Sequence, residues 1–299
     1  MLDETTIDWL THSVCEALAR DEPVGPTALT FLLRQYAATG RDDIAVSLGR
    51  GLAAALETSF ASAPCRERAA WAGLFANVAV ASDDPRVRAM AIDLVDRLKC
   101  EVAPEAGVRA RSLRARLEAS HALGNSESLR EVVSELESFV SERYQPGQPF
   151  GVLDDQLGIA AALLVAHTVT GRLPYSMLAD ELMQSAVHAW WDEQAGAFVN
   201  AREFELNCEA ASLCCGLARL HRDDAYREAA VIPVDADYRG RAERVLRSQA
   251  PLVRTLGVGA ACYGLALADW LDLQFLAMRT RFITRLIYYR FIASRFPLA

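Results

Sequence analysis

Apolar residues recur along this chain at the three- and four-residue spacing of amphipathic helices. One face of the first such stretch, residues 5–20, carries Ile7, Leu10, Val14 and Leu18. No long run of β-branched residues suggests a strand anywhere in the chain. The pattern therefore predicts an all-α protein.

Proline, glycine and short polar runs divide the chain into about twelve predicted helices. The helices before the main loop cover residues 5–20, 27–39, 41–60, 65–81, 86–102, 108–123 and 127–144. The loop at 145–149 is rich in proline and glycine, and it precedes helices predicted at 153–170, at 178–191 and from about Asn207 to His221. Gly40 is expected to end its helix as a C-cap, because glycine accepts the left-handed conformation found there.

Tight turns recur at similar intervals and pair these helices. They lie at residues 40–43, 82–85, 124–126, 171–174 and 222–224, roughly 42 to 51 residues apart. Each turn follows a helix rich in small apolar residues and precedes a more amphipathic one. Such a period indicates helical hairpins that bury their apolar faces against their neighbours. An open superhelix and a closed double layer both satisfy it; six pairs favour an (α/α)6 toroid with an inner and an outer ring.

The C-terminal end differs from the rest. From residue 273 to 299 there is no acidic residue, and five arginines alternate with apolar positions: Arg279, Arg281, Arg285, Arg290 and Arg295. This pattern predicts a basic amphipathic helix. We therefore divide the chain into a toroid at 1–272 and a C-terminal helix at 273–299. The helix is expected to pack on the acidic body; the alternatives are an interface with a second copy or another protein, and a membrane-surface helix.

Composition and charge argue against several classes of protein. A net charge of −8 argues against a nucleic-acid-binding protein. The seven cysteines lie mostly in apolar helical runs, which favours buried thiols in a reducing cytoplasm over a disulfide framework. The acidic N-terminus has no signal-peptide pattern, and no uncharged apolar run reaches 18 residues, so we expect no membrane span.

Three stretches between Leu153 and Leu271 carry a resemblance to a known family. They are Leu153-Asp154-Asp155-Gln156, the loop Trp190-Trp191-Asp192-Glu193-Gln194-Ala195-Gly196-Ala197-Phe198, and residues 207–230, which contain Cys208-Glu209-Ala210-Ala211-Ser212. Together they resemble the helical domain of the thioredoxin-fold family that includes spermatogenesis-associated protein 20. That domain is similar in turn to the six-hairpin toroids of N-acylglucosamine 2-epimerases and several glycoside hydrolases. The chain departs from the family in having no thioredoxin domain before the helices.

In such toroids the ligand lies where the inner helices begin, so the resemblance places a site there. The predicted inner-helix starts carry Arg66, Arg109, Arg111 and several acids. Asp155 and Glu209 are the candidate catalytic carboxylates, because sugar chemistry uses paired acids and bases. The candidate substrate-binding residues are Asp154, Glu205, Asn207, Arg109, Trp191 and Tyr263. For the acids and Asn207 the competing interpretation is helix capping, which is common in a first turn.

Other motifs favour structural roles. None of the five histidines falls at an inner-helix start, which argues against epimerase chemistry; His221 is expected near a helix C-terminus, where the dipole favours it. Cys214 and Cys215 are adjacent on a helix and point about 100° apart, so they are poorly placed to share a zinc ion with His221. The Asp-Asp pairs in the turns are expected to begin helices. We predict no metal and no cofactor.

Two functions remain open. The first is a carbohydrate-related binding or catalytic pocket at the inner-helix starts, for a sugar-like ligand. The second is a non-catalytic helical scaffold that binds a protein partner, through the same funnel or through the basic C-terminal helix.

Overall fold

The computed structural model describes residues 2–101, 103, 105–199, 203–230 and 236–276, and most of them are helical. The α-helices of this part of the chain are α1 (Glu4–Ala19), α2 (Pro26–Thr39), α3 (Asp42–Leu56), α4 (Cys65–Ala81), α5 (Pro85–Cys100), α6 (Ala106–Ala122), α7 (Ser126–Ser141), α8 (Leu153–Thr170), α9 (Leu173–Trp190), α10 (Glu203–Leu220), α11 (Asp224–Ala229), α12 (Tyr238–Leu256) and α13 (Ala261–Leu276). A 3-10 turn, η1 (Gly257–Ala260), joins the last two. The all-α prediction is confirmed.

The turn residues begin and end the helices as their chemistry predicts. Gly40 and Gly171 end α2 and α8 with φ of 66° and 71°, in the left-handed region that costs glycine least. The carboxylates of Asp84 and Asp223 accept hydrogen bonds from the first turns of α5 and α11, and the side chain of Asn125 does the same for α7. Asp84 and Asp223 are therefore helix caps.

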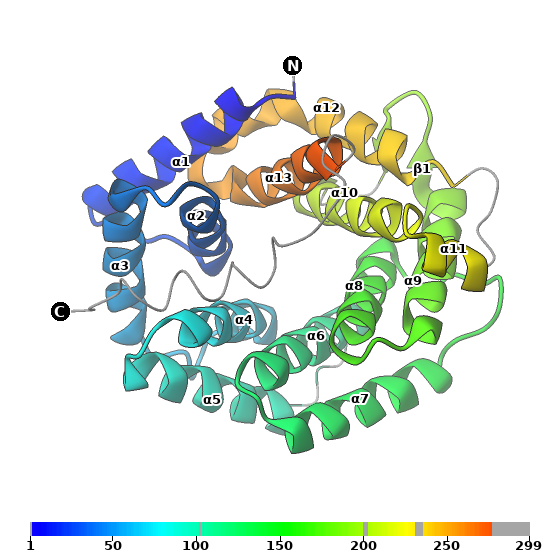
Figure 1. Ribbon diagram of the computed structural model, residues 1–299, viewed down its shortest axis with the longest axis horizontal. Helices are drawn as coiled ribbons and strands as arrows, with labels where there is room; N and C mark the ends of the chain where they lie inside the picture. Colours follow the sequence, from blue (N-terminus) through cyan, green and yellow to red (C-terminus); the bar gives the residue numbers. More distant parts are fainter. Residues whose placement is uncertain (1, 102, 104, 200–202, 231–235, 277–299) are drawn as a thin grey trace.

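The helices pack in pairs that form two layers. The helices α2, α4, α6, α8, α10 and α13 lie nearer the middle in Figure 1, and α1, α3, α5, α7, α9 and α12 lie outside them. Each inner helix contacts the next, and α13 contacts α2. The apolar residues of α4, α8 and α13 are distributed around the whole circumference of each helix. Those of α3, α5, α7 and α12 form a single buried stripe along one side of each helix. This contrast follows from position, because an inner helix is covered on both sides.

The segment between α9 and α10 differs from its prediction. Residues expected to form a plain loop contain an antiparallel ribbon, in which β1 (Trp191–Asp192) pairs with β2 (Ala197–Phe198). The following helix, α10, begins at Glu203, four residues before the expected Asn207. The capping role expected of Asn207 is therefore wrong, because this residue lies inside the helix.

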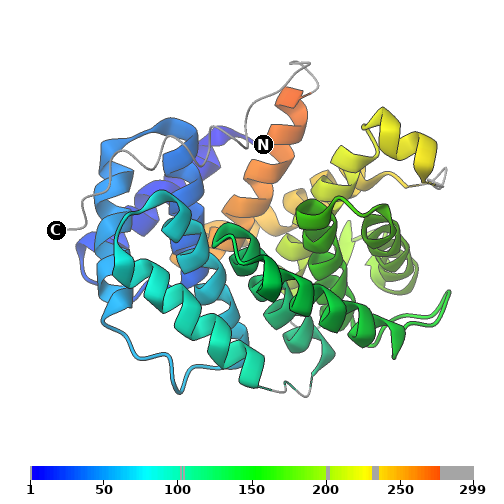
Figure 2. The same cartoon turned by 60° about the horizontal axis from the view of Figure 1, so that its bottom comes forward.

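The expected boundary between residues 272 and 273 falls inside α13, which continues to Leu276. In Figure 2 this helix extends beyond its neighbours. Most of the predicted basic helix, residues 277–299, lies outside the described residues. By length and composition one helical stretch of the described chain, Tyr238–Gln274, could cross a membrane; 39% of its most apolar window is buried in the fold, and core helices of soluble proteins pass the same test.

Candidate functional site

Charged side chains from four inner helices meet in one group, which we call the central charge network. Its members are Arg66 of α4, Arg111, Arg114 and Glu118 of α6, Asp154 of α8 and Glu209 of α10. Nη2 of Arg111 donates to Asp154 Oδ1 at 2.7 Å and to Glu209 Oε2 at 2.5 Å. One guanidinium thus links two carboxylates that are 55 residues apart in sequence, one on α8 and the other on α10.

Helix geometry explains why these residues converge. Arg111, Arg114 and Glu118 are spaced three and four residues apart, so they share one face of α6. Nε of Arg114 donates to Glu118 Oε1 at 3.0 Å, and its Nη1 lies 4.0 Å from Glu209 Oε1. The N-terminal half of α6 packs closely on α8, which brings Asp154 beside Arg111.

The network raises the pKa of two of its arginines, Arg111 and Arg114. Burial by itself would lower the pKa of Arg111, but the charges of Glu209 and Asp154 outweigh it and raise the pKa above its ordinary value. The pKa of Arg114 is raised first by Glu118, and then by Glu209 and Asp269. Asp269 belongs to α13, so the charge that acts on Arg114 comes in part from a helix that is distant from α6 in sequence. The guanidinium groups of Arg111 and Arg114 are therefore permanent cations among the inner helices.

Asp155, one of the two candidate catalytic carboxylates, accepts hydrogen bonds from two backbone N–H groups. Its Oδ1 accepts from the N–H of Gly107 at 2.5 Å, and its Oδ2 accepts from the N–H of Val152 at 3.3 Å. The first bond ties the start of α6 to the start of α8, and the second caps α8. The capping interpretation therefore describes Asp155 in this structure.

The other predicted site residues lie apart from the network. Arg109 points to the outer helix α7, with its guanidinium 4.8 Å from the ring centre of Phe139. Asn207 is buried and exchanges two hydrogen bonds with the backbone of Phe198, at 2.9 and 3.0 Å, which holds β2 against α10. Glu205 is exposed on the first turn of α10.

The two aromatic residues predicted to contact a ligand, Trp191 and Tyr263, pack against other side chains of the protein. Trp191 packs edge-on against Phe198, and the guanidinium of Arg244 in α12 lies 4.9 Å from its ring centre. Tyr263 is buried and stacks on Phe204, with ring centres 6.4 Å apart. Of the eight predicted residues, only Asp154 and Glu209 belong to the central charge network. Arg114 and Glu118 were missed, although their spacing from Arg111 marks them as neighbours on α6.

Close helix packing supports the network, and glycine makes it possible. A Cβ atom at Gly158 of α8 would lie 3.1 Å from the carbonyl oxygen of Gly107 and 3.3 Å from Arg111 Nη1. The side chain of any other residue would push α8 away from α6. Glycine at position 158 therefore sets the distance between the two helices that carry Asp154 and Arg111.

We expect Gly158→Ala to destabilise the protein by about 1–3 kcal/mol through this steric overlap, partly offset by the better helix propensity of alanine. Urea unfolding measures the effect. Gly216→Ala is the matched control on α10, because its Cβ would make an ordinary 3.4 Å contact with Leu164. If the two variants have equal stability, the close approach of α6 and α8 has no energetic role.

A second buried polar cluster joins α9, α10 and α12. Asp180 of α9 accepts from Nε2 of His221 at 2.7 Å, from the hydroxyl of Tyr238 at 2.6 Å and from the amide of Gln184 at 2.8 Å. His221 directly follows the last residue of α10, so its predicted place at a helix C-terminus is confirmed. We call these four residues the Asp180 cluster. It was not expected from the sequence.

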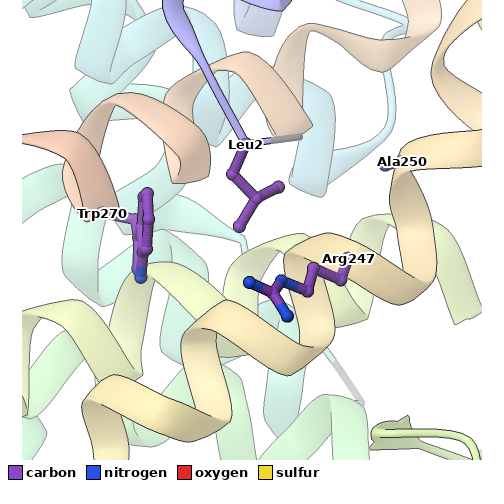
Figure 3. Close-up of a pocket in the computed structure, with 4 residues that line it drawn as sticks. All are labelled: Leu2, Arg247, Ala250 and Trp270. Atoms are coloured by element: carbon purple, nitrogen blue, oxygen red, sulfur yellow. The ribbon is translucent and has the colours of Figure 1, made fainter.

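A cavity of about 430 Å³ lies apart from both clusters. It is lined by Leu2, by Arg247 and Ala250 of α12, and by Trp270 of α13, and Figure 3 shows the side chains of Leu2, Arg247 and Trp270 around a common space. None of its lining residues belongs to the central charge network or to the predicted site.

Comparison with models of known protein families and with curated protein sequences gave no significant match. The resemblance to the helical domain of the spermatogenesis-associated protein 20 family stays a prediction.

Proposed function

We propose that the six helical pairs form a closed (α/α)6 toroid. The contacts from α2 through α4, α6, α8 and α10 to α13, and from α13 to α2, support this closure. Charges also join the two ends of the series, because Arg34 of α2 donates to Asp269 and Asp272 of α13, at 2.8 Å in each case. The resemblance to six-hairpin domains points to the same arrangement.

We further propose that this toroid binds a small, polar, sugar-like molecule at the central charge network. The observation that carries the proposal is that α4, α6, α8 and α10 each direct a charged side chain to one place. Sites for small molecules commonly combine a few convergent polar groups on rigid elements. Sugar hydroxyl groups can donate to the carboxylates and accept from the guanidinium groups. The proposed role is binding, because Asp155 is engaged by backbone amides.

A thermal-shift screen against neutral sugars, sugar acids and amino sugars tests this proposal. A saturable rise in Tm with one sugar class is expected, because a ligand that binds only the folded state stabilises it by about 2.7 kcal/mol at 100 times its Kd. The rise should disappear in Glu209→Gln. It should persist in Glu131→Gln, a matched surface carboxylate that pairs with Lys99 on the outside of the fold.

A non-catalytic scaffold is the second candidate function. The observation that favours it is that Asp155 and Asn207 bind backbone groups, while Asp154 and Glu209 already have an arginine partner. A protein that melts cooperatively and shifts with no sugar would support the scaffold. The next experiment would then measure binding of partner proteins to the full chain and to a chain lacking residues 277–299.

A further inference from the structure

The two most exposed side chains of the central charge network belong to arginines, while its three carboxylate residues, Glu118 at 28% among them, are less exposed. The side chains of Arg66 and Arg114 are 39% and 40% exposed, whereas those of Asp154 and Glu209 are 27% and 18% exposed. Arg111 is 10% exposed and lies between the two carboxylates. A molecule that approaches the network from solvent can therefore reach both of these arginine side chains.

These two arginines also retain hydrogen-bonding capacity. Nη1 of Arg66 lies 3.5 Å from Asp154 Oδ1, and Nη1 of Arg114 lies 4.0 Å from Glu209 Oε1. Both distances exceed the usual range of an N–H···O hydrogen bond. Among the described residues, the hydrogen bond from Arg114 Nε to Glu118 is the only one that either guanidinium makes. A guanidinium carries five N–H donors, so most of them are available to a ligand.

Two carboxylates of the network, Asp154 and Glu209, already share one internal cation. Arg111 donates to both Asp154 and Glu209, and the pKa of Arg111 is raised despite the opposing effect of its burial. A ligand would not replace this internal cation. The nearby Asp269 of α13 is likewise bound by Arg34 at 2.8 Å. Repulsion of an incoming anion by these acids is thereby reduced.

We propose that the ligand of the network is an anionic monosaccharide, whose carboxylate or phosphate binds Arg66 and Arg114. This inference rests on the proposed sugar-binding function and adds the charge of the ligand to it. Carboxylate and phosphate oxygens match the planar fork of arginine, and charge-assisted hydrogen bonds are about twice as strong as neutral ones. The hydroxyl groups of the sugar would donate to the remaining lone pairs of Asp154 and Glu209.

The test compares glucose, glucuronate and glucose 6-phosphate in a thermal-shift titration at constant ionic strength, with sodium sulfate as a separate arm. At least one of the two anionic sugars should bind about tenfold or more tightly than glucose. The two anions separate a carboxylate ligand from a phosphate ligand. Arg66→Gln and Arg114→Gln should each weaken that binding by about tenfold. Arg97→Gln, which alters an exposed pair with Asp93, should leave it unchanged.

The outcomes separate this inference from the proposed function. If glucose binds as tightly as both anionic sugars, the inference is wrong and the sugar-binding function stands. If sulfate gives the same shift as the sugars, the network binds an inorganic anion only, and the inference is overturned. If no compound shifts the Tm, both proposals fail. The Tm and circular dichroism of each variant without ligand show whether it is folded, so that lost binding is assigned to the missing guanidinium.

Discussion

Replacing Asp180 by alanine is expected to destabilise the protein by about 3–5 kcal/mol, the range for removing one partner of a buried pair. The side chain of Asp180 is 6% exposed and accepts from His221, Tyr238 and Gln184. Without it, three donors from α9, α12 and the end of α10 lose their acceptor inside the fold. Thermal unfolding should show a Tm lowered by at least about 5 °C. Asp93→Ala, which removes an exposed partner of Arg97, is the control and should change stability by about 0.5 kcal/mol or less.

The same residue makes stability depend on pH. Burial by itself would raise the pKa of Asp180, but its hydrogen bonds with His221, Tyr238 and Gln184 outweigh burial, and the pKa is lowered below 3.8. A carboxyl group whose pKa is lower in the folded state stabilises the fold above the unfolded pKa. That stabilisation is lost as the pH falls through the folded pKa. The stability difference between the wild type and Asp180→Asn should therefore be full above about pH 4 and shrink below it. A constant difference between pH 6 and pH 2.5 would show that the charge of Asp180 contributes nothing.

Replacing Arg111 by methionine is expected to cost about 3–5 kcal/mol. Methionine fills a similar volume but carries no charge, so Asp154 and Glu209 would face each other without their shared cation. Both accept from the same nitrogen atom, which places the two accepting oxygens within about 5 Å of each other. Urea unfolding at neutral pH measures the loss. Arg97→Met is the surface control and should stay within about 0.5 kcal/mol of the wild type.

A second substitution distinguishes charge repulsion from lost packing. In Arg111→Met with Glu209→Gln, one of the two facing negative charges is gone. The double variant should be more stable than Arg111→Met alone, and the two changes should be non-additive by about 0.5–3 kcal/mol. If the two losses simply add, the main contribution of Arg111 is the packing of its side chain against Gly107 and Gly158.

The helical pattern and the turns could be predicted because their causes are local. The 3.6-residue period of an amphipathic helix can be recognised within a short stretch of sequence. The capping chemistry of Asp84, Asp223 and Gly40 likewise acts within one turn of each residue. The two-residue strands of the ribbon at Trp191–Phe198 could not be predicted from a local sequence pattern. They are too short to show a period, and the buried amide of Asn207 holds the second strand from nine residues away.

The candidate site was predicted in part for a similar reason. Local pattern places Asp154, Asp155 and Glu209 near helix starts, but it does not say which carboxylate meets an arginine and which meets a backbone amide. Asp154 and Asp155 are adjacent in sequence and differ by about 100° in direction on α8. Asp154 consequently bonds Arg111, whereas Asp155 bonds the N–H of Gly107. A difference of one residue separates a member of the central charge network from a cap.

The sequence by itself determined the all-α class, the pairing of helices at intervals of 40 to 50 residues and some of the residues that begin or end them, such as Gly40, Asp84 and Asp223, because each depends on neighbours along the chain. Only the tertiary structure decided that Arg111 joins Asp154 to Glu209, and that Asp180 binds both His221 and Tyr238. Those partners lie between 41 and 98 residues apart. Their meeting depends on how closely whole helices pack, as Gly158 lets α8 approach α6, and a local pattern carries no record of that distance.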